Sequence, residues 1–182
     1  EITGTSSGNT ITKNNILSNN LKNVFNWNGV AQTLTRNWYG TTDEGAISAK
    51  YADTFNAFSP YRLGSVDTAA GADTTPPIAP TGISFDTTGG VGVIRVIWTA
   101  PTINEETNGG AVGFAGVKIY RLQNAVDTTH WANALVWTAG ASDTNWTDTG
   151  VSTGSAYYYR LTSRDAATRV NESFFTDTKS ST

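Results

Sequence analysis

The sequence predicts an all-β protein, in which a β-sandwich follows a short stack of repeated coils closed by one short helix. Three observations predict this fold class. Short runs of alternating apolar and polar residues fill the chain after residue 80, turn-rich polar segments separate them, and a six-residue pattern recurs within the first 40 residues. The composition changes between residues 69 and 80, so we expect two domains in the 182-residue chain.

Charge and composition limit the classes of partner. Only 15% of residues are charged and the net charge is −3, which provides no basic surface for nucleic acid. No apolar run is long enough for membrane insertion. A surface rich in hydroxyl and amide side chains is typical of secreted or surface-layer proteins. The chain lacks cysteine and methionine and begins at Glu1, which favours a processed export product or a fragment. We therefore expect an extracellular or cell-surface location in a bacterium or archaeon.

The first 40 residues contain an internal repeat. The segment Thr10–Asn15 returns 23 positions later as Thr33–Trp38 and matches it in residue type at every position but the last. Repeats of this length usually form stacked units that cannot bury an apolar face alone. The residues expected on the stacked face, and hence on a face available for assembly, are Ile11, Asn14, Ile16, Leu34 and Asn37.

The repeat resembles the coils of a right-handed parallel β-helix, in which an inward aliphatic residue precedes an asparagine at a bend. Asparagine tolerates the left-handed conformation, and its amide can bond to the next coil. Two unrelated hairpin strands remain the alternative. The order from Asn37 to Glu44, then a helix, then Phe58–Tyr61, is similar to the terminal segment of β-helix repeat proteins. This resemblance covers residues 9–64 and implies two last coils with their cap.

A helix is predicted after the second copy of the repeat. Thr41 and Glu44 have the spacing of a capping box, and apolar residues follow at helical intervals over Thr42–Asp53. An aromatic-rich tail completes the first domain, residues 1–72. Because solenoids usually need three or more repeats, we expect either upstream coils of a longer chain or another copy to cover the open end.

The second domain, residues 81–182, is predicted to be a β-sandwich after a proline-rich linker at 73–80. The predicted strands are Gly82–Phe85, Val91–Trp98, Ala115–Arg121, Ala134–Trp137, Ser155–Thr162 and Ser173–Thr176.

Several motifs of this domain resemble a fibronectin type III domain across residues 76–179. They are Pro80, Ile94–Pro101, Gly116–Arg121, Trp146–Gly150 and Ser163–Ser173. The resemblance implies that Trp98 is the core tryptophan. It also implies that Tyr157 is the tyrosine-corner residue, whose hydroxyl bonds to upstream backbone. Alternation then directs Tyr159 and Leu161 toward the opposite sheet and leaves Tyr158 and Arg160 outside.

Two loops depart from that family and are candidate contact sites. One contains Glu105 and Glu106, and the other contains His130 and Trp131. Ordinary solvated insertions remain the alternative. His130 is the single histidine and has no partner implied by spacing, so no catalytic triad is predicted. Aspartates could ligate calcium at the loops, but turn formation explains them better. We expect no catalytic residue, cofactor or metal. The aspartates considered are Asp127, Asp143, Asp148 and Asp165.

Two functions are consistent with these features. The first is a non-catalytic structural or interaction protein that assembles with itself through the open coil end. The second is the C-terminal accessory or spacer region of a secreted carbohydrate-active enzyme, in which Trp131, Trp137 and Trp146 form a sugar-stacking platform. Against that platform, strand alternation places at least Trp137 in the core.

Overall fold

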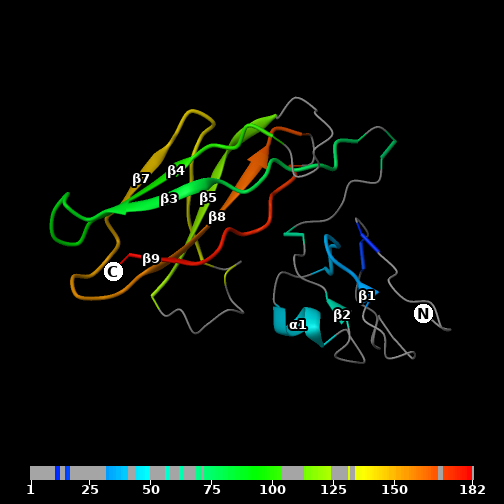
Figure 1. The fold of residues 1–182 in the computed structure, drawn as a ribbon, viewed down its shortest axis with the longest axis horizontal. Coiled ribbons are helices and arrows are strands. Elements are labelled where there is room, and N and C mark those ends of the chain that lie inside the picture. Colours follow the sequence, from blue (N-terminus) through cyan, green and yellow to red (C-terminus); the bar gives the residue numbers. More distant parts are fainter. Residues whose placement is uncertain are drawn as a thin grey trace. The chain divides into compact units, whose positions relative to one another are not determined.

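The structure is a computed structural model in which the chain divides into two compact units, residues 1–72 and 73–182 (Figure 1). The residues that the structure describes are 11–12, 15–16, 32–40, 44–49, 56–57, 62–63, 69–70, 72–103, 113–123, 131, 134–167 and 170–181. Among them, no helix is both long enough and apolar enough to span a bilayer.

Parallel pairing organises the described part of the first unit. Strand β1 (Gln32–Thr33) pairs in parallel with β2 (Asn56–Ala57), with Gln32 opposite Asn56. Asn15 forms a parallel bridge to Trp38. Partners in these pairs are 24 and 23 positions apart, close to the period of the sequence repeat. Successive segments of this unit therefore run in the same direction, side by side.

A small core holds these segments together. Leu34, Tyr39 and Ile47 are almost fully buried, and Ile11, Ile16 and Leu63 pack against them. Ile47 belongs to helix α1 (Glu44–Ser48), so the helix is anchored through one apolar side chain. The predicted helix over 42–53 is observed only at 44–48, and residues 50–53 lie outside the described ranges.

Asn37 is fully buried, and its amide donates to the carbonyl oxygens of Ile11 and Leu34, both at 2.7 Å. Two predictions need correction here. The left-handed residue at this bend is Arg36, with φ of 61°, and not an asparagine. Leu34 and Asn37 are also enclosed within the unit, so they cannot form an exposed assembly face. Asn14 lies outside the described residues.

The second unit consists of two antiparallel sheets that form a β-sandwich (Figure 1). One sheet has the order β3-β4-β7, and the other has the order β6-β5-β8-β9. The strands are β3 (Thr81–Asp86), β4 (Ile94–Thr99), β5 (Phe114–Leu122), β6 (Leu135–Thr138), β7 (Asn145–Asp148), β8 (Tyr158–Asp165) and β9 (Lys179–Ser180).

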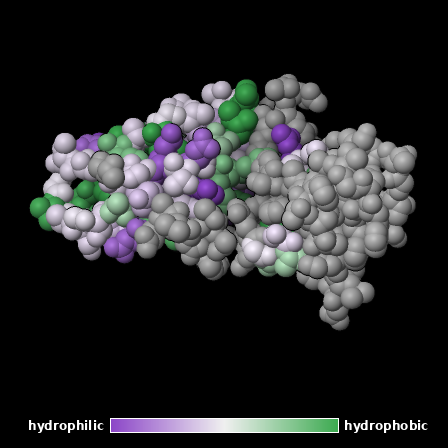
Figure 2. All heavy atoms as spheres, turned by 60° about the horizontal axis from the view of Figure 1, so that its bottom comes forward, coloured by the Kyte–Doolittle hydropathy of each residue, from purple (hydrophilic) through white to green (hydrophobic). Residues whose placement is uncertain are grey.

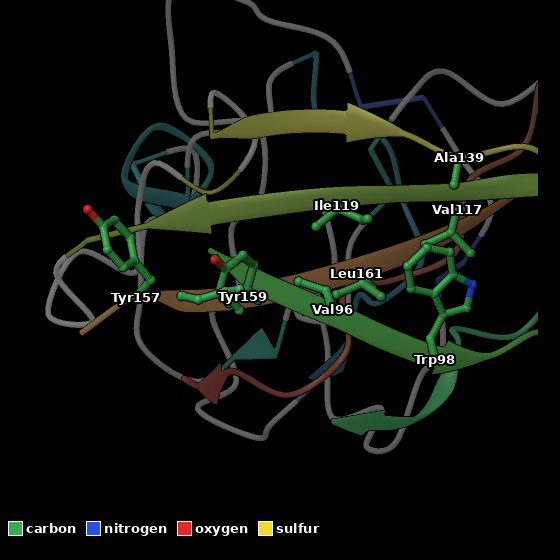
Figure 3. Close-up of a cluster of buried hydrophobic side chains, with 9 residues drawn as sticks. Val96, Trp98, Val117, Ile119, Ala139, Tyr157, Tyr159 and Leu161 are labelled. Atoms are coloured by element: carbon green, nitrogen blue, oxygen red, sulfur yellow. The ribbon is translucent and has the colours of Figure 1, made fainter. Parts of the chain in front are cut away.

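Inward side chains of β4, β5 and β8 fill the space between the sheets. Alternation along β4 buries Ile94, Val96 and Trp98, because successive side chains point to opposite faces. Figure 3 shows the resulting cluster, with Tyr157 toward one end and Trp98 at the other. Burial of each large apolar side chain of this kind contributes about 1.5–3 kcal/mol. The core is therefore one continuous layer along the sandwich.

The sequence misplaced three strands. Val91 lies in the β3–β4 turn and is 87% exposed, so β4 starts at Ile94. The last strand is Lys179–Ser180, and the predicted strand at 173–176 runs instead as an irregular segment. Strand β7, whose Trp146 was noted as a motif, was not predicted as a strand.

Gly116 brings β5 and the start of the β6–β7 turn into close contact. Its φ is 138°, a conformation that other residues rarely adopt, and it follows a bulge against β8. A Cβ at this position would lie 1.9 Å from the carbonyl oxygen of Ala139. Only glycine therefore permits this approach.

The proline-rich segment 73–80 packs on the sandwich rather than running free. Pro76, Pro77 and Pro80 are buried. The Ile78 amide donates to Ile103 at 3.0 Å, and the Asn171 side chain donates to the Asp73 carbonyl at 2.8 Å. The segment predicted as a linker is thus part of the second unit.

Candidate binding surface

The predicted structural residues of the sandwich belong to the same buried core. Trp98, Tyr157, Tyr159 and Leu161 all belong to the buried cluster. The backbone N–H of Ser152 donates to the Tyr157 hydroxyl at 2.9 Å, which is the upstream contact expected of a tyrosine corner. This hydrogen bond lowers the pKa of Tyr157 below its ordinary value.

The candidate contact loops are only partly described. Glu105, Glu106 and His130 lie outside the described residues. Trp131 is 2% exposed, which corrects its prediction as a surface contact residue. The reason is a stacked arrangement on the outer face of β8, where the Arg160 guanidinium lies 5.0 Å from the Trp131 ring centre and 5.8 Å from that of Phe175.

A buried carboxylate lies beside the tyrosine corner. Arg121 Nη1 donates to both oxygens of Asp148, each at 2.7 Å. The Tyr159 hydroxyl donates to the same carboxylate at 3.0 Å, and the Gly150 N–H donates to it at 2.9 Å. Burial, together with the charge of Asp148, raises the pKa of Tyr159 above its ordinary value. We call these residues the corner network: Arg121, Asp148, Gly150 and Tyr159.

A second carboxylate lies on the outer face of the four-stranded sheet. Glu172 pairs with the Lys118 ammonium at 2.6 Å. It also accepts hydrogen bonds from the hydroxyls of Tyr120 at 2.6 Å and Thr162 at 2.5 Å. Burial, and then the charge of Glu172, raises the pKa of Tyr120 above its ordinary value. We call these residues the outer network: Lys118, Tyr120, Thr162 and Glu172.

The aspartates considered for calcium make protein contacts instead. Asp165 accepts from the backbone N–H and the side-chain amide of Asn171, both at 2.8 Å, and Asp143 accepts from the Gly140 N–H at 2.7 Å. Within the described ranges, no group of three or more acidic or histidine side chains is placed to hold a metal ion. Asp127 lies outside those ranges.

A pocket of ≈ 430 Å³ lies where the β3–β4 turn meets the turn before β8. Its lining consists of glycine, threonine, serine, valine and isoleucine residues, none of them charged. A ligand site normally combines an apolar lining with a few convergent polar anchors. This pocket contains no ionisable side chain that could serve as one.

The most distinctive exposed feature is a pair of tryptophans at one lateral edge of the sandwich. Trp137 on β6 and Trp146 on β7 have ring centres 6.0 Å apart and planes inclined by 13°. Each strand is the outermost one of its sheet, and the turn 139–144 connects them. The two indoles therefore bridge the sheets where the sandwich would otherwise be open. We call Trp137 and Trp146 the tryptophan edge.

The two tryptophans differ in exposure. Trp146 lies opposite Val96 and packs against the core. Trp137 lies opposite the buried Ile119, yet it is 48% exposed. Strand β6 is the outermost strand of its sheet, so no further strand covers Trp137 on that side. Val136, the extra residue of a bulge in β6, also packs against the core. The expectation from alternation, that Trp137 is in the core, is therefore wrong.

The surroundings of the tryptophan edge are polar and include charged residues. Thr138 and Thr147 follow the two tryptophans and are exposed on the outer faces of their sheets. Arg95 donates to the half-buried Asn145 at 3.0 Å, and Asp143 is exposed in the connecting turn. Figure 2 shows that apolar residues are dispersed among polar ones over the described part of the face that it displays. The edge is thus a local aromatic feature in a hydroxyl- and amide-rich surface.

No protein-family model matches the chain, and no curated protein sequence matches it. Solved structures share the sandwich. A Fn3-like protein from Clostridium thermocellum is 24% identical with a TM-score of 0.39, and the match covers 57% of this chain and 90% of that one. The third fibronectin III domain of the human KIAA0343 protein is 15% identical with a TM-score of 0.42, over 64% of this chain and 90% of that one.

A β-1,2-glucanase from Parabacteroides distasonis also matches, at 18% identity and a TM-score of 0.41. That match covers 61% of this chain and 13% of the enzyme's chain. The structural neighbours of the second unit thus include fibronectin type III-like sandwich domains.

Proposed function

We propose that this chain is a non-catalytic structural and interaction protein of the cell exterior, in which a fibronectin type III domain follows the last coils of a parallel β-helix. The observation that carries the proposal is the parallel pairing of successive segments in the first unit, at spacings of 23 and 24 positions. Regular parallel stacking of this kind is how solenoids bury an apolar face. The buried Leu34 and Asn37, contacted by the preceding segment through Ile11, support the same interpretation.

The charged groups of the sandwich support a structural role. A general base must reach a substrate proton with an available acceptor. In the described part of the sandwich, the carboxylates of Asp148, Asp165 and Glu172 each accept hydrogen bonds from protein donors. Their geometry therefore favours stability over proton transfer.

Self-assembly would follow from an uncovered coil. A strand at the end of a parallel stack presents backbone N–H and C=O groups that a second copy can pair with. Stacking a like coil on that edge is a head-to-tail contact that does not close, and it builds filaments or sheets. The proposed partner is therefore another copy of this chain or upstream coils of a longer parent chain.

Assembly is tested with a charge placed on the outermost described segment. Asn15 is exposed there, and a lysine on an edge strand opposes strand addition. We expect the unmodified chain to form larger species with rising concentration in light scattering and electron microscopy, and Asn15→Lys to reduce them. Thr33→Lys is the matched control, because Thr33 is exposed on the middle segment and should leave assembly intact.

The contradicting outcome is also defined. A chain that stays monomeric at high concentration would contradict assembly through an uncovered coil. Equal loss of assembly in both lysine variants would likewise contradict the edge mechanism, because only one of them changes the outermost segment.

A second candidate function is favoured by the tryptophan edge. This candidate is the accessory or spacer region of a secreted carbohydrate-active enzyme. Its sugar-binding form needs an exposed aromatic side chain to hold a sugar ring, and Trp137 offers one. Trp131 cannot contribute, because it is buried. Glycan binding by the isolated chain, measured on an array, tests this candidate, and absence of binding would leave assembly as the function.

A further inference from the structure

The tryptophan edge contains more aromatic surface than the core requires. Val136 already packs against the core from β6, and Trp146 does so from β7. Trp137 adds a large ring to an edge strand and leaves 48% of it in water. Stacking on Trp146 also fixes the orientation of the Trp137 ring before any ligand arrives. A rigid, half-exposed aromatic side chain is the kind of residue that dominates binding surfaces.

Several classes of ligand stack on tryptophan, and the surroundings distinguish between them. A nucleic acid needs a basic track for its phosphates, whereas this chain carries a net charge of −3. A methylated ammonium group needs several ring faces around one cation, whereas these two rings lie nearly parallel against each other. The remaining class is a neutral molecule with one apolar face and several hydroxyl groups.

A pyranose ring fits that description. Its C–H face can lie on an indole, and its hydroxyls can reach neutral donors and acceptors at the rim of the ring. The turn that connects the two tryptophan strands supplies exposed polar side chains at Ser142, Asp143 and Thr144. At the edge closed by the turn 139–144, the stacked rings of Trp137 and Trp146 span the gap between the two sheets.

We propose that the exposed face of Trp137 binds a pyranose ring of a neutral glycan, and that Trp146 acts as a positioning residue that holds the Trp137 ring. The site deepens the second candidate function and rests on it. It is separate from the parallel segments invoked for assembly, which lie in the first unit. Further rings of an extended chain would lie along the edge formed by β6 and β7.

The test uses the full chain and three defined probes: cellohexaose, laminarihexaose and xylohexaose. We expect at least one of them to shift the indole N–H resonance of Trp137 in a saturable way, with smaller shifts for the amides of Thr138 and Thr147. Trp137→Ala should weaken that binding by about tenfold or more, which is the effect of losing one stacking partner. Leu135→Ala is the matched control, since Leu135 is 45% exposed on the same strand and should retain the affinity.

Two further variants separate binding from folding. Trp137→Tyr keeps a ring and should recover part of the affinity. Trp146→Phe keeps the core contact while reducing the stacked area, and it should weaken binding less than Trp137→Ala does. Thermal unfolding of each variant checks that the sandwich remains intact.

The outcomes are distinguishable. Glycan binding that survives Trp137→Ala would leave the second candidate function in place and overturn the site. Absence of a saturable shift with every hexasaccharide would overturn both. Equal weakening by Trp137→Ala and Leu135→Ala would overturn the stacking mechanism. The chain could also self-associate without binding any glycan. If Trp137→Ala abolished that self-association, the edge would be a contact with a second copy, and the proposal would be overturned.

Discussion

The corner network and the outer network each pair a carboxylate with a cation and a tyrosine hydroxyl, but in different surroundings. Asp148 lies inside the sandwich with 2% of its side chain exposed, whereas Glu172 lies on the outer sheet face with 10% exposed. The two cations differ as well, because a guanidinium is planar and an ammonium sits on a flexible stem.

This difference decides how much each network can adapt. The Arg121 guanidinium lies 5.3 Å from the Tyr157 ring centre and donates to both Asp148 oxygens, so its position is fixed from two sides. The Lys118 and Arg121 side chains are similarly exposed, at 28% and 22%, but the flexible stem of Lys118 lets its ammonium turn toward water. We therefore expect the corner network to respond more strongly than the outer network to loss of its carboxylate.

The largest effect is expected for Asp148→Ala. The change leaves Arg121 without its counter-ion and Tyr159 without its acceptor, and breaking a buried pair of this kind costs about 3 kcal/mol or more. Chemical denaturation measures the free energy of unfolding. Arg121→Met combined with Asp148→Ala should recover part of the loss, because it removes the unpaired charge. A loss below that of Glu172→Ala would reverse the ranking of the two networks.

Glu172→Ala should have an intermediate effect of about 2 kcal/mol. Tyr120 and Thr162 lose their acceptor at buried positions, but Lys118 can be hydrated. The same denaturation assay applies, and Glu172→Gln is the control that retains an acceptor oxygen. Adding Lys118→Met should change stability little, in contrast to the rescue expected at the corner network.

Alkaline pH tests the tyrosines of both networks together. The pKa values of Tyr120 and Tyr159 are raised in the folded state above the ordinary value of 10.0. Their protonated forms therefore stabilise the fold fully below about pH 10, and this stabilisation declines as the pH rises above it. The decline is about 1.4 kcal/mol per pH unit for each tyrosine. Absorbance of the phenolate should show that Tyr120 and Tyr159 ionise only on unfolding, when the wild type is compared with the Tyr→Phe variant of each. Ionisation of all tyrosines near pH 10 with the fold intact would contradict this.

The smallest effect is expected for Tyr157→Phe. It removes only the hydroxyl that accepts from the Ser152 N–H and retains the buried ring. We expect the midpoint of thermal unfolding of the sandwich to fall by about 5 °C. Tyr158→Phe is the matched control, because Tyr158 is only half-buried, and its midpoint should hardly change. An unchanged midpoint for Tyr157→Phe would remove the support for a tyrosine corner.

The central strands of the sandwich were predictable because their alternation is local. Trp98, Tyr159 and Leu161 face the core as the pattern of their own strands indicates. The β-sandwich class follows from the same pattern and is confirmed by the two antiparallel sheets. Hydrogen bonds across the sequence, such as the one from Asn171 to Asp73, have no local signal.

The tryptophans show where local patterns stop being informative. Trp131 was expected outside and is buried, because Arg160 from a distant strand packs over its ring. Trp137 was expected inside and is half-exposed although it pairs with the buried Ile119, because β6 is the outermost strand of its sheet. Both depend on contacts between segments far apart in the chain. The tryptophan edge could have been suspected from two tryptophans flanking one turn, but their stacking could not.

In the first unit, the repeat predicted the spacing of the paired segments but not the details of the bend. Asn37 was expected to adopt the left-handed conformation, and Arg36 does so. The amide of Asn37 does bond to the neighbouring segment, as expected of this residue, through the carbonyl of Ile11, and it also donates to the carbonyl of Leu34. Whether these segments continue as a β-helix stays a prediction.

Gly116 has a consequence for how such a protein can diverge. The carbonyl of Ala139, which begins the turn between the two tryptophan strands, occupies the place that a side chain at position 116 would take. Any substitution there would displace the segment that carries both indoles. We therefore expect position 137 to tolerate substitution, so that its ligand can change while the backbone stays the same. We expect every substitution of Gly116 to be selected against. A saturation library sorted for folded protein would show this asymmetry between a variable aromatic position and an invariant glycine.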